Sequence, residues 1–109
     1  MLRIKKIAKE IKRVISKRIF LGLQVPISGL ITISEIDLSS DFKYAKIYFS
    51  IFNIEKDASG VKKILISQIP FFKKELAAKL HLRIIPNLIF IYDDSVKKAA
   101  QINKLLHRL

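Results

Sequence analysis

Cysteine and tryptophan are absent from this 109-residue chain, and glycine and proline occur only three times each. Without cysteine the protein has no disulfides, thiolate metal ligands or cysteine nucleophiles, and this composition fits a reducing compartment. The two histidines have no neighbours at metal-ligand spacing, and the three glycines form no phosphate-binding loop. We therefore expect no metal ion and no cofactor.

Acidic residues are also scarce, with nine Asp and Glu that lie mostly at expected turns. They form no pair of carboxylates suited to general acid–base catalysis. Asp93 and Asp94 come just before Ser95, where acidic side chains favour the start of a helix. We therefore expect a protein that is not an enzyme and has no small-molecule substrate. An RNA hydrolase is the enzymatic alternative, and it would need groups that the sequence does not offer.

Long apolar runs are missing as well. The longest uncharged stretch, residues 19–34, contains Gln24, Pro26 and Gly29, and it is shorter than the roughly 20 apolar residues of a membrane-spanning helix. Residues 3–18 interleave charges with Ile and Val, unlike the apolar region of a secretory signal. We expect no transmembrane segment, no secretory signal and a cytoplasmic location.

Basic charge, in contrast, is abundant: 21 Lys and Arg against nine Asp and Glu give a net charge of +12. Such a charge attracts polyanions, which makes nucleic acid and anionic membranes the first candidate partners. The charge lies in two blocks. Residues 1–19 hold eight basic and one acidic side chains, and residues 61–83 hold six and one, whereas residues 20–60 hold three and five. Lysine and isoleucine are both frequent, as in AT-rich genomes, so some lysines are expected to contact only water.

The apolar spacing predicts an α+β fold. Half of the residues are apolar, and the length suits one domain over residues 1–109. Residues 2–19 place Ile and Val on one stripe and Lys and Arg on the other, as in a helix that packs on a sheet. The full set of expected elements is helices over 2–19, 58–68, 70–80 and 95–107, and strands over 30–38, 43–52 and 87–92.

A kink or tight turn is expected where the two central helices meet, at Gln68, Ile69 and Pro70. Proline has no N–H and biases Ile69 away from helical angles, yet it suits the first turn of a new helix. The resulting order of elements resembles a KH-type domain of the second topology, α-β-β-α-kink-α-β, with an added C-terminal helix. A KH domain holds single-stranded RNA with a G-x-x-G loop, which this chain lacks. Recognition is therefore expected to rely on backbone charge and shape.

Three segments and their order resemble the bacterial ribosome-binding factor A family. Residues 31–41 are similar to its first strand and turn, and residues 45–50 to its second strand. The most specific segment is 82–95, which is similar to the family's L-R-x-x-P-x-L-x-F-x-x-D-x-S pattern. The resemblance begins with the basic first helix and covers nearly the whole chain.

The resemblance implies a KH-like protein of one domain that binds the small ribosomal subunit during late maturation. It further implies assistance in processing the small-subunit rRNA, an association with growth in the cold, and no catalytic activity. The implied partners are small-subunit rRNA and the immature small subunit, with no membrane partner, and we expect a monomer. The family's Ala-x-Gly kink is replaced here by Gln68, Ile69 and Pro70, which puts the local geometry of the kink in question.

The candidate RNA-binding residues are the basic side chains of the first helix, the two central helices and the family segment. They are Arg3, Lys5, Lys6, Lys9, Lys12, Arg13, Lys62, Lys63, Lys73, Lys74, Lys79 and Arg83. Arg83 has a structural alternative, as an ion-pair partner of Asp41 or Asp93. Phe71 lies off the apolar stripe and is a separate candidate for base stacking, with core or interface packing as its structural alternative. For the first helix as a whole, the alternative is a module that binds an anionic membrane or a protein partner.

Overall fold

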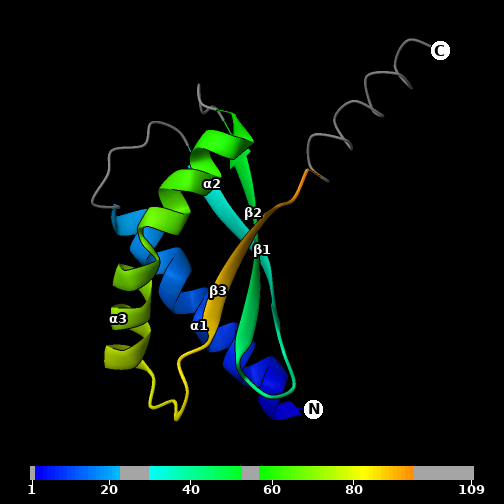
Figure 1. Ribbon diagram of the computed structural model, residues 1–109, viewed down its shortest axis with the longest axis vertical. Coiled ribbons are helices and arrows are strands. Elements are labelled where there is room, and N and C mark those ends of the chain that lie inside the picture. Colours follow the sequence, from blue (N-terminus) through cyan, green and yellow to red (C-terminus); the bar gives the residue numbers. More distant parts are fainter. Residues whose placement is uncertain (1, 23–29, 53–56, 95–109) are drawn as a thin grey trace, which may run out of the picture.

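The computed structural model describes residues 2–22, 30–52 and 57–94, which form three helices and a three-stranded sheet (Figure 1). This confirms the α+β fold, and the observed bounds agree with the predicted ones within two residues. The expected helix over 95–107 lies outside the described residues. In chain order the elements are α1 (Leu2–Leu21), β1 (Leu30–Leu38), β2 (Tyr44–Phe52), α2 (Ala58–Ser67), α3 (Ile69–Lys79) and β3 (Asn87–Tyr92).

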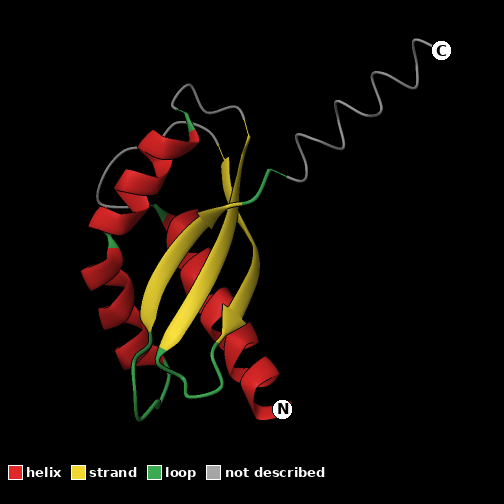
Figure 2. Cartoon of the chain, turned by 45° about the vertical axis from the view of Figure 1, so that its right-hand side comes forward, coloured by secondary structure: helices red, strands yellow, loops and turns green. Residues whose placement is uncertain are grey.

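The sheet has the order β1-β2-β3, and β2 pairs antiparallel with β1 and parallel with β3. A parallel pair needs a long crossover, which α2 and α3 supply between β2 and β3. The three helices cover one face of the sheet, and no described element covers the opposite face, which we call the open face (Figure 2). Along β2, Ala45, Ile47 and Phe49 are buried under the helices, whereas Tyr44 and Lys46 point to the open face and are exposed.

Three phenylalanines join the sheet to the helices. The rings of Phe49 on β2 and Phe90 on β3 meet edge to face, with centroids 6.4 Å apart. Phe72 on α3 packs against Phe90 with a centroid distance of 5.9 Å. All three side chains are essentially fully buried, and such aromatic pairs add about 0.5–1.5 kcal/mol to the stabilisation from burial. The cluster fixes the position of α3 on the sheet.

A β-bulge at Ser34 keeps β1 in phase with the core. Ile33 is paired with Phe49 and Glu35 with Tyr48, so Ser34 is an extra residue. Its hydroxyl oxygen lies 3.2 Å from the Tyr48 carbonyl oxygen and 2.9 Å from the Asp93 carboxylate. The insertion leaves both halves of β1 with their Ile and Leu side chains on the buried face.

The helices α2 and α3 meet at Gln68, which is the C-cap of α2 and the N-cap of α3. Its N–H points at the carbonyl oxygens of Ile64 and Leu65, and its own carbonyl accepts from the Phe72 N–H at 2.9 Å. Helix α3 begins at Ile69 rather than at Pro70. The prediction that Ile69 lies outside the helix is therefore wrong. Pro70 lies in the first turn of α3, where its missing N–H breaks no hydrogen bond.

The β1–β2 turn is closed by Asp41. Its carboxylate accepts from the Ser39 hydroxyl at 2.7 Å and from the Lys43 N–H at 3.1 Å. These hydrogen bonds, chiefly the one from Ser39, lower the pKa of Asp41 below its ordinary value. Phe42, the next residue, has a φ of +62°, in the left-handed region that bulky side chains rarely adopt. The turn therefore holds Phe42 in a strained conformation.

Replacing Phe49 by Ala should lower the free energy of unfolding by about 3–5 kcal/mol, because it removes a buried ring from the centre of the core. Phe52 lies on the same strand and is 67% exposed. The matched variant Phe52→Ala should change the free energy by no more than about 0.5 kcal/mol. Urea denaturation of both variants measures the difference, and similar losses would contradict the observed burial.

The Asp41 carboxyl should titrate below the ordinary aspartate pKa of about 3.9 when its side-chain resonance is followed by NMR. In Ser39→Ala the midpoint should rise toward that value, because the largest cause of the lowered pKa is removed. Because the pKa of Asp41 is lower in the folded protein than in the unfolded chain, folding favours the ionised carboxylate. The turn's contribution to stability is complete above the unfolded pKa and is lost as the pH falls through the folded pKa. An unchanged midpoint in Ser39→Ala would contradict the role of that hydrogen bond.

Candidate nucleic-acid interface

The first helix presents its lysines to solvent because its apolar stripe is buried. Ile11, Val14 and Ile15 pack into the core, and α1 lies against β1 and α3. On the opposite side, Lys5, Lys6 and Lys9 are exposed. Within the part of the chain that the structure describes, no hydrogen bond or ion pair occupies their ammonium groups. These three lysines are therefore available to an external anion.

The next two basic residues of α1 are partly engaged within the protein. The Lys12 ammonium donates to the Ser34 carbonyl oxygen at 3.2 Å, where the bulge brings β1 close to the helix. Arg13 and Glu10 form an exposed ion pair at 3.0 Å. An exposed pair of this kind is worth at most about 1 kcal/mol, so a stronger anion can compete for Arg13.

A second group of cations lines a cleft of about 190 Å³ between α1 and α3. It contains Lys79 and Arg13, which are 66 positions apart in the sequence, together with Lys17 and Arg18. Glu75 is the acidic side chain in its lining. Lys17 and Arg18 were not among the predicted binding residues. Lys17 could have been predicted from the sequence, because it lies one helical turn from the candidate Arg13. Arg18 has no such spacing and lines the cleft because α3 packs against α1.

Phe71 lies under an arginine. The Arg18 guanidinium is 5.2 Å from the centre of the Phe71 ring, and its Nη2 donates to the Gly22 carbonyl oxygen at 3.1 Å. A guanidinium over a ring is attracted by the negative charge of the ring face. The contact therefore favours the packing interpretation of Phe71 over base stacking.

Of the predicted lysines of α2 and α3, those of α2 do not form one patch with Lys5, Lys6 and Lys9. Both views place α2 and the N-terminal end of α1 at opposite ends of the molecule (Figures 1 and 2). Lys73 is partly buried and donates to the Asn87 side-chain oxygen at 3.0 Å, which ties α3 to the start of β3. The exposed members of this set are Lys62, Lys63, Lys74 and Lys79.

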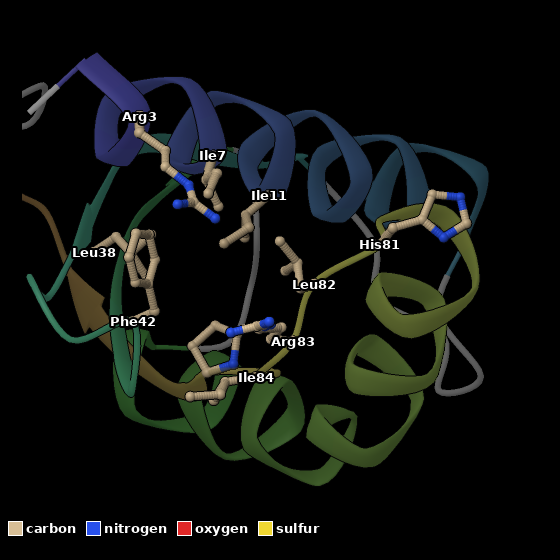
Figure 3. A pocket seen from close by; sticks show the side chains of 10 residues that line it. Arg3, Ile7, Ile11, Leu38, Phe42, His81, Leu82, Arg83 and Ile84 are labelled. Carbon is tan, nitrogen blue, oxygen red and sulfur yellow. The ribbon is translucent and has the colours of Figure 1, made fainter.

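The two remaining candidates, Arg3 and Arg83, are brought together by the fold. They line a cavity of about 520 Å³ between the start of α1, the β1–β2 turn and the segment after α3 (Figure 3). We call it the Arg3–Arg83 pocket. Arg83 is exposed here, while the Asp41 carboxylate is bonded within its own turn and Asp93 accepts from Ser34. The Arg3 guanidinium lies 5.8 Å from the centre of the Phe42 ring.

Two further kinds of site are absent from residues 2–22, 30–52 and 57–94. These residues contain no group of three or more His, Cys, Asp or Glu side chains that could hold a metal ion. None of their helices is both long and apolar enough to cross a membrane. Of the two histidines, His81 is exposed beside the Arg3–Arg83 pocket, and His107 lies outside the described residues.

Comparisons with known proteins agree with one another. Among curated proteins, the chain is similar to ribosome-binding factor A of Francisella tularensis subsp. novicida, with 37% identity over 97% of this chain and 73% of that protein. It is also similar to that of Clostridium botulinum (strain Okra), with 32% identity over 95% of this chain and 88% of that protein.

Two solved structures share the fold. The crystal structure of ribosome-binding factor A from Thermus thermophilus has a TM-score of 0.72 at 21% identity, over 82% of this chain and 93% of that chain. A Thermus thermophilus model fitted into a cryo-EM map of a 30S–RbfA complex has a TM-score of 0.66 with the same identity and coverage. The family model described as "Ribosome-binding factor A" matches residues 3–106. The chain therefore belongs to the ribosome-binding factor A family.

Proposed function

We propose that this protein is a non-catalytic ribosome assembly factor that binds the small ribosomal subunit through its basic helical surfaces. The observation that carries the proposal is the row of exposed, unengaged lysines on α1, in a chain of a family named for ribosome binding. A relative of the same fold has been fitted into a complex with the 30S subunit, which supports the same partner for this chain.

The physical basis is neutralisation of rRNA phosphates. Lysines that contact phosphates release condensed counterions, and this term does not depend on base sequence. The α1 lysines suit that role because burial of the apolar stripe holds the helix, and hence the charges, in a fixed position. The cations of the α1–α3 cleft add a second anchoring point. Binding is then governed by where phosphates lie on the folded rRNA.

The finer parts of the proposal rest on the family. We propose that the protein acts as a monomer in the cytoplasm on immature small subunits and assists the late processing of their rRNA, including during growth in the cold. We also propose that Gln68, Ile69 and Pro70 take the place of the family's Ala-x-Gly kink. The support for the last point is that Gln68 caps both α2 and α3.

Membrane or partner binding through the apolar side of α1 is the weaker alternative. Such binding would have to expose Ile11 and Ile15, which are fully buried, together with Val14. Exposing a buried apolar side chain costs about 1.5–3 kcal/mol. The cost for three of them is comparable to the whole stability of a small protein, so the core competes directly with a membrane for this stripe.

Removing a phosphate-contacting lysine should reduce the salt dependence of binding. The slope of log K against log salt is negative, and Lys5→Ala and Lys9→Ala should each reduce its magnitude by about one. Lys46→Ala removes the same charge from the open face of the sheet and should leave the slope unchanged. Anisotropy of the labelled protein with purified small subunits, measured from low to high KCl, provides the slopes. Equal slopes for all three variants and the unchanged protein would contradict the α1 assignment.

The proposed partner is tested directly by sedimentation. Tagged protein should co-sediment with immature small subunits, less with mature small subunits, and not with large subunits. Anionic phosphatidylglycerol vesicles at matched salt provide the membrane control. Preference for vesicles or for large subunits over small subunits would overturn the proposal.

A further inference from the structure

The Arg3–Arg83 pocket is shaped and charged for a ligand that is flat, apolar and attached to a negative group. We propose that it binds one unstacked nucleotide of single-stranded RNA, with the base in the pocket and its phosphate between Arg3 and Arg83. The inference rests on the proposed RNA-binding function and extends it, because it assigns a nucleotide site that phosphate contacts along a helix do not require.

The interior of the pocket is apolar. Ile7 and Ile11 of α1 form one wall, and Leu82 and Ile84 form part of the other. Figure 3 shows the Leu82 side chain pointing toward Ile11. Its volume of about 520 Å³ is within the range of pockets that hold small organic ligands. A nucleobase has apolar faces that such walls can cover.

Arg3 and Phe42 form a stacking platform at one side. The guanidinium is held over the Phe42 ring at 5.8 Å, and its side chain points into the pocket (Figure 3). A planar guanidinium has two faces, and bases stack on guanidinium planes as they do on aromatic rings. Arg3 and Phe42 therefore bring to one side of the pocket two planar groups on which a base can stack.

The strained backbone of Phe42 is a second, independent observation. At a φ of +62°, Gly or Asn would be the usual residue, whereas an aromatic side chain is an outlier. Such conformations persist only where the surrounding structure enforces them, and they cluster at ligand-binding sites. Here the strained residue is the one whose ring lies beneath Arg3.

The charge around the pocket selects an anion. Arg83 lies across the pocket from α1, and none of the described lining residues is acidic. In the β1–β2 turn beside the pocket, the Asp41 carboxylate accepts from the Ser39 hydroxyl and the Lys43 N–H. Lys6 lies one helical turn from Arg3 and is exposed. An RNA strand carries a phosphate on each side of the base, so it matches these separated cations better than a peptide with one carboxylate does.

The test is an NMR titration of the ¹⁵N-labelled full chain with AMP, GMP, CMP and UMP, and with inorganic phosphate as the probe without a base. At least one nucleotide should shift the amides of residues 3–7, 42 and 81–84, and phosphate should bind more weakly at the same amides. Arg3→Ala and Arg83→Ala should each weaken nucleotide binding about tenfold, the loss of one charge-assisted contact. Lys46→Ala, on the open face, should bind as the unchanged protein does.

A further variant separates stacking from folding. Phe42→Leu keeps an apolar side chain in the turn but removes the aromatic face, so it should leave the dispersed amide spectrum intact and weaken binding. No localised shift with any nucleotide, an equal response to phosphate alone, or tighter binding of a peptide through its C-terminal carboxylate would overturn the inference. Co-sedimentation with small subunits without a nucleotide response contradicts only this inference. A nucleotide response without co-sedimentation contradicts only the proposed function.

Discussion

Burial of the apolar stripe of α1 is the constraint on which the rest of the surface depends. Ile11, Val14 and Ile15 are locked between β1 and α3, which leaves the helix no freedom to rotate about its axis. The lysines on the other side are therefore displayed at fixed positions. Rotation by a quarter turn would bury charge and expose Ile, at a cost of several kcal/mol. The same packing that stabilises the core thus decides where the α1 lysines are available to an external anion.

The sheet contributes through its parallel pair. Because β3 runs parallel to β2, the chain must cross from one end of the sheet to the other, and α2 and α3 make that crossing. The segment after α3 consequently returns to the end of the sheet where the β1–β2 turn and the start of α1 lie (Figure 1). The pocket between Arg3 and Arg83 is a product of this topology, since 80 positions separate the two residues in the sequence.

The lysines differ in whether their ammonium groups donate hydrogen bonds within the protein. Lys12 and Lys73 hold backbone or side-chain oxygens of the protein itself, and both connect a helix to the sheet. Lys5, Lys6 and Lys9 have no such task within the described residues. The lysines of the described residues therefore include side chains that tie helices to the sheet and side chains that are available to an external anion.

The described helices and strands and the outward direction of the α1 lysines could be predicted from the sequence alone, because the 3.6-residue and two-residue periods are local properties of the chain. It also predicted the α2–α3 junction near Gln68, although it placed the start of α3 one residue late at Pro70. The tertiary structure is what brings Lys17, Arg18 and Lys79 into one cleft and Arg3 and Arg83 into one pocket. Those neighbours come from different helices and loops, and no local pattern encodes a distance between residues far apart in the chain.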